Sequence, residues 1–379
     1  MRTSEYVSLG HPDKIADYIS EYILDRILEQ DKNARYALEV QIKDKFVTLG
    51  GEISTKASIS AEKWVKEAVE EIGYTKKYAE KWGKENTICS DDLQVRVLFS
   101  TQSPDIAQGV NRDGWGDQGI FFGYAENNPD TNYMPLDHFL AKELNNILYN
   151  KAKKDGIGGL DIKTQITLDD DDMIEEIIVA IPAKDKKEFT KIKRIVEAWA
   201  GKKNITPTTV TIINGTGKYI KHSSMGDCGT TGRKLAVDFY GGNSPIGGGS
   251  PWTKDGTKAD LALNIAARSA ARYELINSTH PFKFSAECRM SCCIGKSEIN
   301  ASLIIKDKYG QILEKRQTKQ ICIPQELLMH LVCKILNLRY YVKGDYLVLM
   351  MMNTHGRIKK CRLLKSKRME RPHSDLLKT

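Results

Sequence analysis

The sequence predicts an α+β fold of three similar units, each a β-sheet with one face covered by helices. A pattern of two apolar strands followed by an amphipathic helix occurs three times, at a spacing of about 120 residues. The chain of 379 residues, 41% of them hydrophobic, is long enough for two or three domains with a sizeable core. The order of the strands within each sheet does not follow from these patterns.

In the first copy, apolar and polar residues alternate over residues 38–42, and a short connection leads to a second strand at Phe46–Leu49. This spacing predicts a β-hairpin. An amphipathic helix follows from about Ser60, and Gly73 is its predicted end. Its apolar stripe consists of Trp64, Val65, Ala68, Val69 and Ile72.

The second and third copies repeat the pattern. The second predicts strands at Thr164–Leu168 and Ile174–Ile181, and then a helix with Phe189, Ile192, Val196 and Trp199 at helical spacing. The third predicts strands at Phe282–Cys292 and Ile299–Ile305, and then a helix that begins at Pro324. The uncovered sheet faces are expected to pack on one another or on another subunit.

We divide the chain into domains at residues 1–101, 114–220 and 221–356, with a basic tail at 357–379. Segment Arg357–Arg371 holds eight Lys or Arg and one Glu, so it carries +7 of the net charge of +8. The body is therefore nearly neutral. We interpret the tail as solvated or partly helical; a weak, salt-sensitive contact with nucleic acid remains an alternative.

Several classes of protein are excluded. No apolar run approaches the ~18 residues of a membrane helix, and the N-terminus lacks a signal-peptide core. The eight cysteines show no paired zinc spacing, and Cys288 and Cys292 alternate with Met290 as expected for core thiols. These features favour a reducing cytoplasm.

The first candidate for chemistry is Gly10–Lys14, which leads into an amphipathic helix. Pro12 suits the first helical position, so His11 and Asp13 are expected at a helix N-terminus, where free N–H groups attract anions. His11 would contact a phosphate, and Asp13 would hold a bridging Mg²⁺. The alternative is an ordinary N-cap with an exposed His.

Two glycine-rich loops add charge. Segment Met225–Lys234 combines glycines with Asp227, Arg233 and Lys234, at a spacing that differs from a Walker A loop. Segment Gly247–Asp260 adds Lys254, Lys258 and Asp260. Clustered cations with interspersed carboxylates suit a metal–polyphosphate ligand; the alternative is a solvated surface loop.

A third turn, Gly114–Gly119, contains Asp117, and the polar run from Gln102 to Gly114 is interpreted as a mobile lid. The sequence shows no Ser–His–Asp order, Cys–His nucleophile or HExxH helix. The residues alone therefore predict an enzyme that binds Mg²⁺ and phosphate.

Five motifs together resemble the S-adenosylmethionine synthetase (methionine adenosyltransferase) family, over roughly residues 4 to 340. They are Gly10–Asp17, Gly50–Ile53, Gln102–Ile106, Gly116–Gly119 and Met225–Lys234. The resemblance implies three α+β domains, interleaved in sequence and related by a pseudo-threefold repeat. It also implies a homodimer or tetramer, paired sheet to sheet, with active sites built from both chains. The implied substrates are ATP and L-methionine: the methionine sulfur attacks C5′, and the triphosphate leaves and is cleaved to pyrophosphate and phosphate.

The resemblance implies roles for individual residues. Around ATP it places His11, Asp117, Asp161, Lys163, Lys218, Tyr219, Asp227, Arg233, Lys234, Ser250 and Lys254; among these, His11, Arg233, Lys234 and Lys254 would act catalytically on the leaving triphosphate. Around methionine it places Glu52, Gln102, Asp227 and Lys258. Asp13 and Asp260 would hold two Mg²⁺ ions per site, and Glu39 a K⁺ ion.

The chain departs from the family pattern at four places. Trp115 replaces a small residue, and the lid is several residues short. Residues 250–253 read Ser-Pro-Trp-Thr in place of Ala-Phe-Ser-Gly, which leaves dependence on potassium open. The basic tail replaces a Gly- and aromatic-rich C-terminus. Two alternatives therefore remain: another Mg²⁺–nucleotide enzyme such as a kinase, and a catalytically impaired synthetase homologue with a regulatory or binding role.

Overall fold

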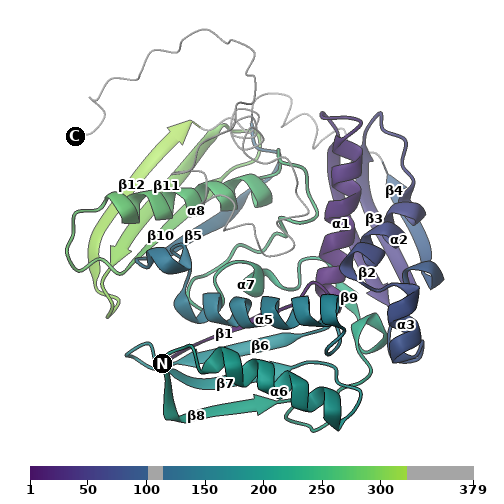
Figure 1. Cartoon of the computed structure of the whole chain (residues 1–379). Helices are drawn as coiled ribbons and strands as arrows, with labels where there is room; N and C mark the ends of the chain where they lie inside the picture. Colours follow the sequence, from purple (N-terminus) through teal and green to yellow (C-terminus); the bar gives the residue numbers. More distant parts are fainter. Residues whose placement is uncertain (101–113, 322–379) are drawn as a thin grey trace, which may run out of the picture.

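The computed structural model describes residues 1–100 and 114–321, which form three four-stranded sheets (Figure 1). Three predicted features lie outside these ranges: residues 102–113 of the lid, which include Gln102, the helix predicted from Pro324, and the basic tail. No helix in the described part of the chain is long and apolar enough to cross a membrane.

The first sheet has the order β4-β3-β2-β9. Its strands are β2 (Arg35–Lys43), β3 (Phe46–Ser54), β4 (Gln94–Ser100) and β9 (Gly229–Thr230). Strands β2 and β3 form the predicted antiparallel hairpin, whereas β4 runs parallel to β3. Helices α1 (Pro12–Leu28) and α2 (Ala61–Ile72) pack on it, and α3 (Lys76–Trp82) follows α2. The predicted bounds of α2 are confirmed, since Ser60 is its N-cap and Gly73 its C-cap.

The second sheet has the order β1-β6-β7-β8. Its strands are β1 (Arg2–Val7), β6 (Lys163–Leu168), β7 (Ile174–Ala180) and β8 (Ile205–Ile213). Strands β6 and β7 form the second predicted hairpin, and β8 runs parallel to β7. Helices α5 (Leu136–Asp155) and α6 (Lys186–Ala200) belong to this unit. On α6, Ile192, Val196 and Trp199 are buried, as their spacing predicted.

The third sheet has the order β12-β11-β10-β5. Its strands are β5 (Gly119–Glu126), β10 (Ser285–Cys292), β11 (Glu298–Lys306) and β12 (Ile312–Ile321), and α8 (Ala259–Asn277) packs on β5 and β10. The predicted start of the first strand was wrong: β10 begins at Ser285, and Phe282 lies outside it, 74% exposed. Cys288 is a buried free thiol, as predicted.

The three units are interleaved in a cyclic manner. Strand β1 joins the second sheet, but the helix after it, α1, packs on the first. Strand β5 joins the third sheet and α5 packs on the second, while β9 joins the first sheet and α8 packs on the third. The short helix α7 (Leu235–Asp238) lies between β9 and α8 in sequence. The expected pseudo-threefold α+β architecture is therefore confirmed (Figure 1).

Each sheet also has an uncovered face that bears exposed apolar side chains. Phe46 and Leu98 lie on the first sheet, Ile120 on the third, and Val210 and Ile212 on the second. Exposed apolar groups on three separate sheets are typical of surfaces that pack against a partner.

Candidate active site

The site is built around the N-terminus of α1, where His11 is the N-cap. Its Nδ1 accepts a hydrogen bond from the Asp13 backbone N–H at 3.2 Å. The residue is only 3% exposed, so the alternative of an exposed His is wrong. Burial, together with the charges of Lys234 and Lys163, lowers the pKa of His11 to about 2. The imidazole is therefore neutral at pH 7, and because Nδ1 accepts, Nε2 carries the proton.

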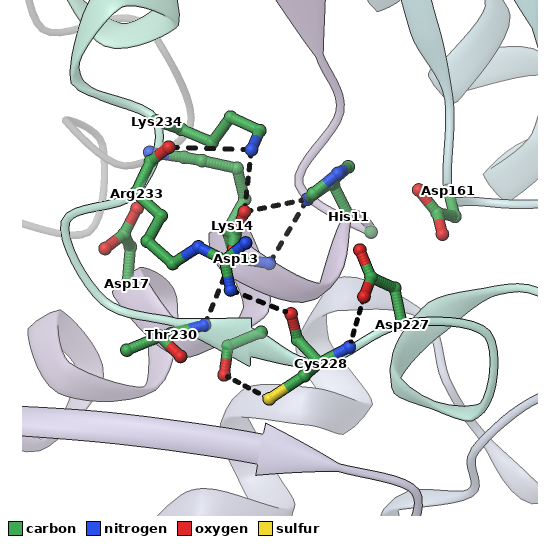
Figure 2. A network of polar contacts seen from close by, with 12 residues as sticks. His11, Asp13, Lys14, Asp17, Asp161, Asp227, Cys228, Thr230, Arg233 and Lys234 are labelled. Atoms are coloured by element: carbon green, nitrogen blue, oxygen red, sulfur yellow. Dashed lines mark hydrogen bonds and ion pairs between the residues drawn. The ribbon is translucent and has the colours of Figure 1, made fainter.

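Asp13 joins this helix to the glycine-rich loop. Its Oδ1 accepts a hydrogen bond from Thr230 N at 2.9 Å, and Lys234 Nζ lies 2.7 Å from Oδ2. Arg233 Nε is 3.7 Å from Oδ1, and its side chain is about half exposed. The loop approaches so closely that a Cβ on Gly229 would lie 2.1 Å from the carbonyl oxygen of Pro12. The two cations of the loop therefore lie at the helix end that favours anions (Figure 2).

A buried ion network lies beneath this loop. Lys14 Nζ is 3.1 Å from Asp17 Oδ2 and 2.6 Å from Asp238 Oδ1, and all three side chains are at most 4% exposed. Asp17 Oδ1 accepts a hydrogen bond from Gly232 N, and Asp238 Oδ2 accepts one from Trp252 Nε1 at 2.7 Å. Burial raises the pKa of Asp17 to about 6, although Lys14 opposes the shift. The network therefore ties α1 to both loops that carry candidate cations.

Asp161 and Tyr219 form a second part of the site, and in the view of Figure 2 Asp161 lies on the far side of His11 from Lys234. Asp161 Oδ2 accepts a hydrogen bond from Ser223 N at 2.9 Å. Burial raises the pKa of Asp161 to about 6, and burial and the Asp161 charge raise the pKa of Tyr219. Asp227 is exposed; its Oδ1 accepts a hydrogen bond from Cys228 N, and its charge acts on both His11 and Asp161. The structure thus brings Asp161, Tyr219, Asp227 and Lys163 into one neighbourhood with His11, whereas Lys218 is exposed on the adjoining loop.

The remaining cations form a third part, where α8 begins. Lys254 Nζ lies 3.2 Å from Asp260 Oδ2 and donates a hydrogen bond to the Ser250 carbonyl oxygen. Lys258 is the N-cap residue of α8. Asp117 belongs to the same neighbourhood, because the charges of Asp117 and Asp260 both raise the pKa of Cys292, after burial. This part adjoins the glycine-rich loop Met225–Lys234, since a Cβ on Gly232 would lie 2.8 Å from the Cβ of Ser250.

Glu39 and Glu52 project from the first sheet next to these loops. Glu39 Oε2 accepts a short hydrogen bond from the Thr231 hydroxyl. Glu52 pairs in register with Ala37, and Ala37 also forms a β-bridge with Lys254. Glu39 is therefore bonded directly to the glycine-rich loop, and Glu52 lies across one strand from Lys254.

The sequence did not reveal the groups that hold this site in place. Lys14 and Asp17 belong to the Gly10–Asp17 motif, but their buried network is completed by Asp238 and Trp252, far away in the chain. The i,i+3 spacing of Lys14 and Asp17 was the available signal. Trp115, a departure from the family pattern, is fully buried behind residues 294–296.

Comparison with known proteins gives a consistent result. Models of the N-terminal, central and C-terminal domains of S-adenosylmethionine synthetase match residues 1–104, 112–219 and 222–356. The chain is 38% identical over 312 residues to S-adenosylmethionine synthase of Mesoplasma florum, a match that covers 78% of this chain and 80% of the relative. It is 37% identical to the Staphylococcus epidermidis enzyme over 297 residues, which cover 71% and 72%.

A solved structure shows the same relationship. The S-adenosylmethionine synthetase from Campylobacter jejuni, described as unusual, superposes with a TM-score of 0.73 at 32% identity, covering 91% of this chain and 88% of the other. Three consecutive domain models, relatives well above 30% identity and a shared fold lead to one conclusion: the chain belongs to the S-adenosylmethionine synthetase family.

Proposed function

We propose that the protein is a methionine adenosyltransferase, a transferase that makes S-adenosylmethionine from ATP and L-methionine. The methionine sulfur attacks C5′ of ATP, the triphosphate departs, and its hydrolysis yields pyrophosphate and phosphate. The observation that carries this proposal is the arrangement of Lys234, Arg233 and neutral His11 at the N-terminus of α1. A displacement at carbon needs no protein nucleophile, but it needs donors aimed at a highly anionic leaving group.

His11 is suited to the oxygen that leaves C5′. Because its Nδ1 accepts the Asp13 N–H, its remaining ring proton is on Nε2, which donates a hydrogen bond to an oxygen that gains charge. Burial strongly lowers the pKa of His11, so the free imidazole is neutral at pH 7 and is suited to donating this hydrogen bond. Arg233, Lys234 and Lys254 would neutralise the phosphate oxygens.

The carboxylates fit Mg²⁺ held jointly with phosphate. In residues 1–100 and 114–321, no group of three or more His, Cys, Asp or Glu side chains could hold a metal by itself. Asp13 and Asp260 each offer hard oxygens beside a lysine, so two Mg²⁺ ions would take most of their ligands from phosphate and water. Bound Mg²⁺ would neutralise the charge of the triphosphate. Glu39 would be the acidic ligand for K⁺, through the carboxylate whose Oε2 accepts the Thr231 hydroxyl.

The other residues would select the two substrates. Asp161, Lys163, Lys218 and Tyr219 would bind the nucleoside side of ATP, with Ser250 and Asp117 at the α8 end. Glu52, Asp227 and Lys258 would surround methionine, together with Gln102, which lies outside the described residues. The uncovered apolar sheet faces support a homodimer or tetramer in which both chains complete each site. We place the enzyme in the cytoplasm.

One incubation tests the function. Purified protein is mixed with ATP, Mg²⁺ and methionine, and the products are resolved by mass. We expect S-adenosylmethionine, pyrophosphate and phosphate in equal amounts. Formation of ADP would instead indicate a kinase, and binding of both substrates without turnover would indicate a catalytically impaired homologue.

A further inference from the structure

A chain of hydrogen bonds through Tyr78 and His222 holds the backbone beside Asp161 and Tyr219. His222 Nδ1 lies 2.6 Å from the Ile220 carbonyl oxygen, and its Nε2 lies 2.7 Å from the Tyr78 hydroxyl. Because a carbonyl oxygen only accepts, the proton is on Nδ1. Burial lowers the pKa of His222 to about 4, so the ring is neutral at pH 7 and Nε2 accepts. Tyr78 therefore donates to His222.

The same tyrosine hydroxyl accepts a hydrogen bond from Leu160 N at 2.9 Å. The chain thus runs from Leu160 N–H through Tyr78 and His222 to the Ile220 carbonyl, with each donor matched to an acceptor. Leu160 precedes Asp161, and Ile220 follows Tyr219. One relay therefore fixes the backbone next to both members of the pair.

The relay is buried and closely packed. His222 is 1% exposed, and its ring packs edge-to-face on Trp82 at 4.8 Å and on Tyr78 at 5.8 Å between centroids. The next residue, Ser223, has a left-handed backbone with φ 59° and donates its N–H to Asp161. A non-glycine residue in that conformation persists only where its surroundings enforce it. This conformation of Ser223 points its backbone N–H at the Asp161 carboxylate and so orients it.

We propose that Tyr78 and His222 are positioning residues that set the nucleoside-binding pair Asp161 and Tyr219, and hence the affinity for the adenosine part of ATP. The proposal rests on the proposed function. Leu160, which the relay holds, directly precedes Asp161 in the chain. In Figure 2, Asp161 lies on one side of His11, whereas Lys234 and Arg233 lie on the other. Breaking the relay is therefore expected to weaken nucleoside binding and to leave phosphate binding unchanged.

The test uses Tyr78→Phe, which keeps the ring but removes the hydroxyl, with Tyr149→Phe as the matched control. Tyr149→Phe likewise removes a tyrosine hydroxyl, but this hydroxyl donates a hydrogen bond to the Ile72 carbonyl oxygen at 2.7 Å, outside the chain of bonds from Leu160 to Ile220. For Tyr78→Phe we expect KM for ATP to rise about tenfold while kcat changes less than about twofold. Calorimetry is expected to show the same loss for ATP and none for inorganic tripolyphosphate, which lacks the nucleoside. Tyr149→Phe is expected to change neither ligand's affinity.

A second variant, His222→Asn, keeps a donor near the Ile220 carbonyl but removes the acceptor for Tyr78. If both residues act through one relay, the double variant is expected to be no worse than the weaker-binding single variant. Equal loss of ATP and tripolyphosphate binding, additive effects, or unchanged ATP binding would each overturn the inference. Since binding is measured without turnover, absence of adenosyl transfer by the parent protein would reject the proposed function and leave this test valid.

Discussion

Removal of the Lys14 cation is expected to destabilise the protein more than removal of any surface lysine. In Lys14→Met the side-chain stem keeps its volume, but Asp17 and Asp238 lose the charge between them. The side chains of these carboxylates are 0% and 4% exposed, so water replaces the lost partner poorly. Breaking a buried ion pair from one side typically costs about 3–5 kcal/mol.

A double variant checks the expected loss in the free energy of unfolding. The double variant Lys14→Met/Asp238→Asn removes one of the two stranded charges, so it is expected to recover part of the lost stability. Lys66→Met serves as a control, because Lys66 forms a 2.7 Å ion pair with Glu62 on the surface of α2, where such pairs contribute less than about 1 kcal/mol.

The assay is urea unfolding at pH 7 and fixed protein concentration, followed by circular dichroism. Fixed concentration matters because association would shift the midpoint by mass action. We expect a much lower midpoint for Lys14→Met than for Lys66→Met. Equal midpoints for these two variants, or further loss in the double variant, would refute the idea that Lys14 neutralises two buried carboxylates.

Four further predictions follow from the site and the chain. Lys254→Ala and Arg233→Ala are each expected to lower kcat about 100-fold or more; a rise in KM alone would assign that residue to ground-state binding. Asp13→Asn is expected to shift the Mg²⁺ titration of activity to higher concentration, and an unchanged titration would make Asp13 only a helix residue. Glu21 is buried, and neither of its carboxylate oxygens has a hydrogen-bond partner among the described residues, so burial raises its pKa well above the usual value. The stability that Glu21 contributes is therefore present at low pH and lost as pH rises. The thermal stability of Glu21→Gln is expected to exceed that of the parent by a margin that grows from pH 5 to 8, and a constant margin would contradict this. Ending the chain before Arg357 is expected to leave adenosyl transfer largely intact and to remove any salt-sensitive binding to heparin, and loss of the folded dimer on this truncation would refute the prediction.

Local patterns predicted the hairpins and α2, because each element's partner is its neighbour in sequence. The cyclic exchange was not predictable in this way: β9 has only two residues, and β1 pairs with β6 far along the chain. Charge and glycine spacing indicated Asp13 and Lys234 as candidate site residues, and the fold brings these two side chains to 2.7 Å. Nothing in the sequence indicated the proposed role of His222, because this role depends on Tyr78, which only the fold brings close to it.

The cyclic exchange of strands has a consequence for synthesis of the protein. The sheet that starts with β2 gains its last strand, β9, only when residues 229–230 have left the ribosome, and β5 pairs with β10 later still. The nascent chain therefore carries unpaired strand edges through most of its translation, which is when such edges recruit other chains. For the same reason, a gene fragment ending at residue 104 encodes a family domain in sequence but an incomplete sheet in space.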